Sequence, residues 1–597
     1  MSKSASSTAN EPRIKVETMK ILGISCFYHD AAAALVIDGR LEAAALEERF
    51  TGIKHDADLP RHAIDFCLDK TGLNIADLDF IVFYDKPFTK FDRILAGYIQ
   101  TVPGSYPAFR KAVPVWLREK LWLPQILRKE LGFHGKVLFT EHHLSHAAGA
   151  YYCSPFDHAA LLTIDGVGEW ATASIGKGLG NKIEITKSMN YPHSVGLLYS
   201  AFTYFLGFEV NSAEYKVMGL APYGEPKYAD LIKNELVKIY EDGSIHLNMK
   251  YFKYHYGLAM TGRRFEKLFD RPRRNPDSEL TDSDRDIAAS IQNVTEEIIF
   301  NMARHTQKLT GDNRLCLSGG VALNCAAAGK LLQSGMYDDI YIQPASSDSG
   351  GAVGAALYAH YSLTDEHKNG GQPYFSLGPS YTASEIKDFL MSIKAPYKAA
   401  EEPELPGIIA QHIAEGKIVA VFNGPMEFGP RALGFRSILA DPRKAEMKER
   451  INKAVKFREP FRPFAPAVIE EKAADYFTGV RKSPYMLFNF EVKPEMRNKI
   501  PAVTHIDGTA RIQTVNRDDN KMLFDILMQF EKLTGTAVLL NTSLNLRGHP
   551  IVLSPQEAFR TFISSGIDIL ILGHHILDKK DFAGGQFENH KIAAGRD

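Results

Sequence analysis

The sequence has few of the features that mark secreted, membrane-spanning or thiolate-metal proteins. Its 597 residues include only five cysteines, none in a CxxC spacing, and each lies among apolar neighbours. Such cysteines are typical of reduced core residues, not of disulfide frameworks or zinc knuckles. No apolar run reaches the ~18 residues of a membrane helix, and no signal-peptide core is visible. We therefore expect a cytoplasmic protein without a membrane partner.

An excess of either charge is also lacking. The formal net charge is -1, from 70 Lys and Arg against 71 Asp and Glu. A balance of this kind creates no field that would gather nucleic acid, so we expect no nucleic-acid partner. Any phosphate ligand must then be held by local clusters of basic residues.

Length and composition predict more than one domain. Residues 1–18 are polar and poor in large apolar residues, which predicts a disordered leader. Residues 363–380 are rich in glycine, proline and polar residues and form the best linker in the chain. We therefore predict an α/β protein with an N-terminal domain over 19–370 and a C-terminal domain over 371–597.

Two similar patterns of strands indicate a duplication within the N-terminal domain. Each pattern has three apolar runs, at 21–25, 31–37 and 41–46 and again at 159–164, 171–175 and 183–188. A polar turn follows the first run of each, and a helix-like stretch follows the third. A duplicated core with a cleft between its halves explains this recurrence. The alternative is that a large α/β protein contains two such hairpins by chance.

Two histidines and two carboxylates are candidate metal ligands. His142 and His146 follow an apolar run, and on a helix they would lie on one face. Asp165 stands on the second polar turn, and Asp348 lies in a loop of small residues over 346–351. Such a mixed nitrogen and oxygen set suits Fe²⁺ or another first-row divalent metal. The alternative is a helix N-terminus with solvated histidines.

Glycine-rich segments are candidates for nucleotide binding. Gly319 and Gly320 end an apolar strand and precede a helix that begins near Asn324. Backbone amides in such a turn can approach a phosphate. Gly350, in the loop over 346–351, has a similar setting. A tight strand-to-helix turn without a ligand remains the alternative.

Basic residues of the C-terminal domain lie on loops stiffened by glycine, proline and aromatic residues. These are Arg431, Lys456, Arg458, Arg462, Arg511 and Arg547. Guanidinium groups held on rigid loops suit phosphate recognition, whereas ordinary surface ion pairs are the alternative. In the N-terminal domain, His29 precedes Asp30 on the first polar turn and is a candidate for proton transfer.

Eleven motifs in order resemble the O-carbamoyltransferases, a family that includes the nodulation protein NodU and the cephem and tobramycin carbamoyltransferases. They include FYHDAAAALVIDG, HHLSHAAGAYY, IDGVGEW, LSGGVALNC, PASSDSGGAVGAAL, FGPRALG, REPFRPFAP and NTSLNLRGHPIV. The resemblance implies an actin/Hsp70-like duplicated N-terminal domain, similar to the tRNA threonylcarbamoyl transferases. It also implies an α/β C-terminal domain similar to the threonylcarbamoyl-adenylate synthases, the YrdC-like fold.

The same resemblance assigns roles to residues. His142, His146, Asp165 and Asp348 match the metal ligands, and His29 matches a histidine near the transferred carbamoyl group. Gly319, Gly320 and Asn324 match the nucleotide loop. Arg431, Lys456, Arg462 and Arg511 match the anion-binding positions. Two residues depart from the family pattern: Pro425 stands in place of an arginine and Phe435 in place of an asparagine.

The activity implied is an ATP-dependent O-carbamoyl transfer. Carbamoyl phosphate and ATP, with Mg²⁺, would give carbamoyl-adenylate in the C-terminal domain. The N-terminal domain, with Fe²⁺ or a similar metal, would pass the carbamoyl group to a hydroxyl of a small natural product. A tRNA-directed carbamoylation enzyme, an actin-fold small-molecule kinase and a non-enzymatic nucleotide-binding protein are the alternatives. The oligomeric state is open, with a homodimer as one expectation.

Overall fold

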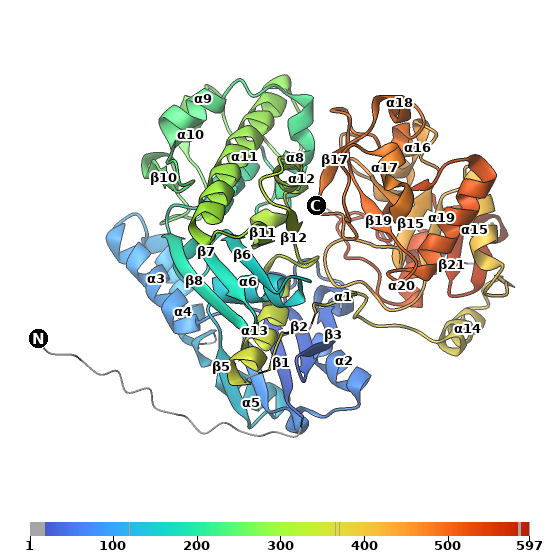
Figure 1. The fold of residues 1–597 in the computed structure, drawn as a ribbon, viewed down its shortest axis with the longest axis horizontal. Helices are drawn as coiled ribbons and strands as arrows, with labels where there is room; N and C mark the ends of the chain where they lie inside the picture. Colours follow the sequence, from blue (N-terminus) through green and yellow to red (C-terminus); the bar gives the residue numbers. More distant parts are fainter. Residues whose placement is uncertain (1–17, 119, 365, 369, 583–586, 596–597) are drawn as a thin grey trace, which may run out of the picture.

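The computed structural model describes residues 18–597, except 119, 365, 369, 583–586 and 596–597. The predicted leader over 1–18 lies outside the described residues apart from Thr18. In Figure 1 the N-terminal domain occupies the left and centre, in blue to yellow, and the C-terminal domain lies to the right, in orange and red. Among the described residues, no helix is long and apolar enough to cross a membrane.

The N-terminal domain is built from two five-stranded sheets with the same order. The first runs β3-β2-β1-β4-β5, and the second runs β8-β7-β6-β11-β12 when its order is read in the same sense. Their strands are β1 Lys20–Ser25, β2 Ala32–Ile37, β3 Arg40–Leu46, β4 Phe80–Phe83 and β5 Lys136–Phe139, then β6 His158–Ile164, β7 Ala171–Leu179, β8 Lys182–Asn190, β11 Arg314–Ser318 and β12 Asp339–Tyr341.

Strand directions also agree between the two sheets. In each, the first three strands form an antiparallel meander, and the last two lie parallel to the first. The predicted duplication is therefore confirmed. The predicted strands and turns agree with this structure to within a few residues, and the helix-like stretch expected after the third run of the first pattern contains α2, Arg61–Thr71.

A helix follows the fifth strand of each sheet, and the two helices pack on one another between the sheets. They are α6, His142–Cys153, and α13, Asp348–Leu363. A Cβ atom added to Gly354 would lie 1.8 Å from the carbonyl oxygen of Ser145, so the two backbones touch where this glycine stands. This close approach fixes the two helix N-termini side by side.

One sequence expectation is corrected at α13. The segment over 346–351, predicted to be a loop, contains the first turn of this helix, which begins at Asp348. Glycine favours loops because it lowers helix propensity, but here the small residues allow the helix to sit in a crowded interior. Thirteen of its sixteen residues are buried.

The C-terminal domain is a mixed sheet of eight strands flanked by helices. Its order is β13-β22-β21-β14-β15-β20-β16-β19. The strands are β13 Lys398–Ala399, β14 Val419–Phe422, β15 Arg436–Ala440, β16 Ala465–Ile469, β19 Gln513–Val515, β20 Val538–Ser543, β21 Ile569–Leu572 and β22 His575–Asp578. Helices α15, Leu405–Ala414, and α19, Lys521–Thr534, pack together. The expected α/β C-terminal domain is confirmed.

The predicted linker over 363–380, which we call the strap, runs between the two domains. In its described residues, neither helix nor strand occurs between Leu363 and Ala383. Phe375 and Leu377 are nevertheless buried in the N-terminal core. The amide of Phe428 in the C-terminal domain donates to the carbonyl oxygen of Phe375 at 2.7 Å. The strap therefore holds the two domains against each other. All five cysteines are free and buried, as the sequence predicted.

Candidate metal centre and shared cavity

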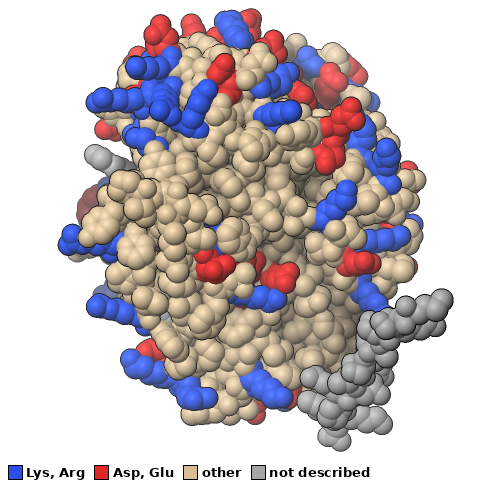
Figure 2. All heavy atoms as spheres, turned by 90° about the vertical axis from the view of Figure 1, so that its left-hand side faces the viewer, with Lys and Arg blue, Asp and Glu red and all other residues tan. Residues whose placement is uncertain are grey.

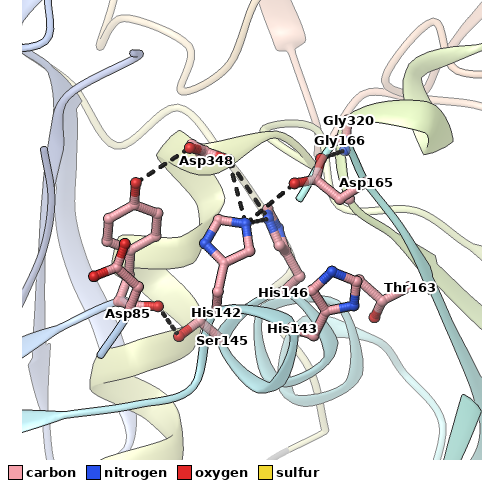
Figure 3. A network of polar contacts seen from close by, with 12 residues as sticks. Asp85, His142, His143, Ser145, His146, Thr163, Asp165, Gly166, Gly320 and Asp348 are labelled. Carbon is pink, nitrogen blue, oxygen red and sulfur yellow. Dashed lines mark hydrogen bonds and ion pairs between the residues drawn. The ribbon is translucent and has the colours of Figure 1, made fainter. Parts of the chain in front are cut away.

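Four side chains converge where the two central helices begin (Figure 3). His142 and His146 lie one turn apart on α6, with their Nε2 atoms 3.1 Å apart. Asp165 follows β6, and its Oδ2 lies 3.1 Å from Nε2 of His142. Asp348 opens α13, and its Oδ1 lies 3.7 Å from Nε2 of His142 and 3.6 Å from that of His146. The four predicted ligands thus form one cluster.

These distances fit a first-row divalent metal. Ligand atoms about 2.1 Å from such a metal lie about 3.0 Å apart in octahedral and about 3.4 Å apart in tetrahedral geometry. One atom from each of the four residues lies within 4.8 Å of all the others. Two imidazoles with two carboxylates make a donor set that suits iron, cobalt or zinc. The residues present therefore fit the predicted metal.

Electrostatics of the cluster support the same conclusion. Burial lowers the pKa of His142, but Asp348 and Asp165 outweigh it and raise this pKa above its usual value. Burial raises the pKa of Asp348, but His29 and His142 lower it to about 2. The ionised form of two buried carboxylates is stabilised by nearby positive charge, which a divalent cation can supply as well as the histidines.

Backbone and side-chain donors hold the ligands in place. The amide of Gly320 donates to Oδ1 of Asp165 at 2.8 Å. The hydroxyl of Tyr84 donates to Oδ2 of Asp348 at 3.2 Å. The amide of His142 donates to the carboxylate of Glu169, which satisfies the first turn of α6. Contacts of this kind orient metal ligands and tune their basicity.

His29 lies beside the cluster and belongs to a small network of its own. Its Nε2 is 3.9 Å from Oδ2 of Asp348, and its Nδ1 is 3.2 Å from Oδ2 of Asp30. The other oxygen of Asp30 lies 2.7 Å from Nδ1 of His55. Burial lowers the pKa of His29, yet Asp348, Asp30 and Asp165 raise it to about 9. Asp30 therefore fixes the ring of His29 toward the metal cluster.

A cavity of about 430 Å³ lies between the two domains. The N-terminal domain contributes His29, Asp165, Gly320 and Asn324 to its lining. The C-terminal domain contributes Arg431, Arg458, Arg462 and Arg511. Asp165 of the metal cluster and the arginine cluster thus face one space.

The arginines are close enough to repel one another. Burial and the charges of Arg511 and Arg462 lower the pKa of Arg431 to about 9. Burial and the charge of Arg462 hold the pKa of Arg458 well below its usual value. The Nε atoms of Arg431 and Arg511 are buried and have no hydrogen-bond partner among the described residues. Concentrated, incompletely satisfied guanidinium groups are suited to bind a polyanion.

The remaining predicted residues lie around this cavity in supporting positions. Lys456 donates to the carbonyl oxygen of Ser543 and, at 2.8 Å, to Oδ1 of Asn545, and both of these residues line the cavity. Arg547, outside the lining, donates to the carbonyl oxygen of Phe457 at 3.4 Å.

The glycines that the sequence assigns to nucleotide binding mainly allow close packing of the backbone. Gly319 has φ +87°, and a Cβ there would lie 2.3 Å from the carbonyl oxygen of Ile164. The side chain of Asn324 caps the next helix, α12, Cys325–Gln333, by accepting from the amide of Ala327. Gly350 is outside the cavity lining, and a Cβ there would lie 2.1 Å from the carbonyl oxygen of Ala345. The alternative of a tight structural turn therefore describes these glycines well, although Gly320 and Asn324 do line the cavity.

Several residues of the site were not singled out from the sequence. Tyr84, Glu169 and His55 carry contacts that only the tertiary structure reveals, although His55 and Glu169 fall within motifs that the sequence already displayed. Arg49 was also missed, and it donates to the carbonyl oxygen of Gly429 across the domain interface at 2.9 Å. Pro425 and Phe435, the two departures from the family pattern, lie outside the cavity lining.

Comparison with known proteins agrees with this architecture. The Carbamoyltransferase N-terminus family matches residues 20–357, and the Carbamoyltransferase C-terminus family matches residues 410–579. The uncharacterized protein sll1178 of Synechocystis sp. is 47% identical over 94% of this chain and 96% of its own length. Nodulation protein NolNO of Sinorhizobium fredii is 37% identical over 93% of this chain and 79% of its own.

Similarities to more distant proteins are weaker. Nodulation protein U of Rhizobium tropici is 29% identical over 89% of this chain and 91% of its own length. Among solved structures, the match to HypF of T. kodakarensis covers 58% of this chain and 48% of HypF, with 12% identity and a TM-score of 0.31, a value too low to establish a shared fold. Both halves of a two-domain family are matched, and the chain therefore belongs to the carbamoyltransferase family of enzymes.

Proposed function

We propose that this protein is an ATP-dependent O-carbamoyltransferase of the cytoplasm that acts on a hydroxyl of a small molecule. Water would hydrolyse carbamoyl phosphate to carbamate and phosphate, and an oxygen of the carbamate would attack the α-phosphorus of ATP. Carbamoyl-adenylate and pyrophosphate would form. The acceptor hydroxyl would then attack the carbamoyl carbon, releasing AMP and leaving the carbamoylated product.

The single observation that supports this proposal most is the shared cavity. A reactive mixed anhydride must reach the acceptor before water hydrolyses it. A cavity lined on one side by an arginine cluster and on the other by His29 and by Asp165 of the candidate metal centre supports formation and transfer in one space. The domain bounds we propose are 19–370 for transfer and 371–597 for adenylate formation.

In the first half-reaction, the arginine cluster would bind the phosphates. Arg431, Arg462 and Arg511 would neutralise the charge that develops as pyrophosphate leaves, and Mg²⁺ would accompany the nucleotide. Since these guanidinium groups repel one another without a ligand, binding of a polyanion relieves this repulsion. Lys456 would act indirectly, by fixing Ser543 and Asn545 in the cavity wall.

In the second half-reaction, His29 would act on the carbamoyl group. Held by Asp30 and facing Asp348, it would accept the proton of the attacking hydroxyl or donate to the carbonyl oxygen. Fe²⁺ or a similar metal, held by His142, His146, Asp165 and Asp348, would supply Lewis acidity toward the phosphate of the adenylate.

Product analysis tests this proposal. The protein should be incubated with ATP, carbamoyl phosphate and Mg²⁺, and its products resolved by ³¹P NMR. We expect pyrophosphate, phosphate and AMP, and no pyrophosphate when carbamoyl phosphate is omitted. ADP as the nucleotide product would instead support a kinase and overturn the proposal. Addition of tRNA should leave the rate unchanged.

A further inference from the structure

A helical hairpin in the first half of the N-terminal domain has no counterpart in the second. Between β4 and β5 the chain forms α3, Pro87–Gln100, α4, Tyr106–Arg118, and α5, Leu123–Leu131. The equivalent connection between β11 and β12 contains one short 3₁₀ turn and α12. The duplicated core therefore does not need α3 and α4. In Figure 1 they lie at the edge of the molecule farthest from the C-terminal domain.

Helix α3 has its charged and apolar residues reversed relative to an ordinary surface helix. Lys90 and Arg93 are buried, whereas Phe88 is 65% exposed and Ile99 is 64% exposed. Lys90 forms a 2.6 Å ion pair with Asp85, and Arg93 stacks on the ring of Tyr191 at 4.9 Å. Surface helices normally direct their apolar face inward. In α3 two cationic side chains are buried, and two large apolar side chains are exposed to solvent.

Exposed apolar side chains are concentrated on this hairpin. Eight of the twenty-one large hydrophobic residues that are exposed in the described chain lie between positions 88 and 122. They are Phe88, Ile99, Val102, Tyr106, Phe109, Val115, Leu117 and Trp122. Ile99, Val102 and Tyr106 surround the turn between α3 and α4, which we call the hairpin tip, and all three are more than 60% exposed. A concentration of this kind marks an interaction surface.

The same segment carries a local excess of positive charge. Residues 86–131 contain nine Lys and Arg against three Asp and Glu, and seven of the nine cations remain when the buried Lys90 and Arg93 are left out. Arg110, Lys111 and Arg118 are exposed and form no ion pair with any residue that the structure describes. Figure 2, which faces the side on which α3 and α4 lie, shows a broad uncharged area with Lys and Arg side chains along part of its edge and Asp and Glu side chains along another part.

We infer that the hairpin binds the surface of a bilayer that contains anionic lipid. Helices with exposed aromatic and aliphatic residues and free Lys and Arg insert their apolar face below the headgroups, while their cations bind lipid phosphates. Tyr106 and Trp122 suit the headgroup level. A second copy of this chain fits less well, because symmetric contact would bring two basic surfaces together. The expectation of no membrane partner rested on the lack of a long apolar run, which does not exclude binding at the surface of a bilayer, and the net charge of the whole chain conceals the local excess.

Vesicle flotation with the full chain tests the inference. We expect binding to phosphatidylcholine vesicles that contain about 30 mol% phosphatidylglycerol, weak binding to neutral vesicles, and loss of binding in high salt. The charge variant Arg110→Gln/Lys111→Gln/Arg118→Gln should bind about a hundredfold less, since each basic residue contributes about fivefold.

The tip variant Ile99→Ser/Val102→Ser/Tyr106→Ser should also lose binding. Its matched control is Leu179→Ser/Met391→Ser/Ile506→Ser, which changes residues 63%, 60% and 62% exposed elsewhere and should bind like the wild type. Circular dichroism melting verifies that each variant folds. Absence of wild-type binding, or equal loss in the control, would overturn the inference. A lipid-free dimer that the tip variant converts to monomer would overturn it in favour of a second copy. None of these readouts depends on carbamoyl transfer.

Discussion

At the scale of single residues, the candidate metal centre depends on donor atoms that face one another. Nε2 of His142 lies within 3.1 Å of both His146 and Asp165, so its imidazole stands at the centre of the cluster. The neighbouring His143 lies on another face of α6, and its Nδ1 contacts Oγ of Ser174 at 3.1 Å. Adjacent histidines therefore have different surroundings and should have different effects.

His142→Ala should lower the affinity for the divalent metal by more than about a hundredfold, because it removes the central nitrogen donor. His143→Ala, which also removes a buried imidazole from α6, should retain the metal. Metal content after gel filtration, measured by mass spectrometry, checks both variants. Equal metal content in His142→Ala and the wild type would show that this residue is not a ligand.

The four candidate ligands could be predicted because their residue types and positions after strands carry the signal. The residues that hold them could not. Tyr84 and Glu169 contact Asp348 and His142 across long sequence separations, and neither stands in a distinctive spacing. Gly320 was predicted to direct its amide toward a phosphate, whereas this amide donates to Asp165. The sequence shows which hydrogen-bond donors are present, but it does not show to which acceptor each of them donates.

At the scale of elements, the candidate metal centre depends on the contact between α6 and α13. Both helices begin at a ligand, and Gly354 allows their backbones to touch near that end. The strands could be predicted because their apolar runs and polar turns are regular. The start of α13 could not, because its glycines and serines resemble a loop and only packing favours the helix.

Gly354→Ala should destabilise the protein, since the added methyl would lie 1.8 Å from the carbonyl oxygen of Ser145. Overpacking of this kind costs about 1–3 kcal/mol or more, so the melting temperature should fall by several degrees. Gly407→Ala in α15 is the matched control, because nothing lies within 4 Å of its added Cβ. Replacing an unhindered helical glycine should be neutral or stabilise by about 0.5–1 kcal/mol. If both variants melt at the same temperature, the helix contact does not constrain the fold as described.

At the scale of the whole molecule, the domains are joined by buried polar contacts as well as by the strap. Lys216 lies on α8, Glu214–Leu220, and its Nζ is 3.3 Å from Oε1 of Glu459. Glu459 belongs to the loop of the C-terminal domain that carries Arg458 and Arg462. Burial raises the pKa of Glu459, but the charge of Lys216 outweighs it and lowers this pKa below 4.5. A carboxylate whose pKa is lower in the folded protein stabilises it above pH 4.5, and this contribution is lost as the pH falls through the folded value.

The melting temperature of the wild type should therefore fall more steeply between about pH 5 and about pH 3 than that of Glu459→Gln, because the folded pKa lies below 4.5. Glu459→Gln resembles protonated Glu459 at every pH. Its melting temperature should therefore be lower than that of the wild type at the upper end of this range, and it should fall less as the pH falls. Calorimetry over this range measures the difference. Parallel curves for the two proteins would mean that the pair does not couple the domains.

Sequence alone predicted two domains with a metal set in one and basic loops in the other. It could not predict that Asp165 and the arginines of the basic loops would line a common cavity, because that depends on contacts such as Arg49 with Gly429, which are 380 residues apart. The linker illustrates the same limit. Its composition predicted an irregular segment, but the burial of Phe375 and Leu377 depends on what packs around them.

The central claim is that carbamoyl activation and carbamoyl transfer use different walls of this cavity. Pyrophosphate release from ATP and carbamoyl phosphate, compared between His142→Ala and Arg462→Ala, tests it most directly. His142→Ala should release pyrophosphate at close to the wild-type rate, whereas Arg462→Ala should lose about a hundredfold or more, and the surface control Arg450→Ala should lose nothing. Normal pyrophosphate release by Arg462→Ala, or an equal loss in both variants, would contradict the account.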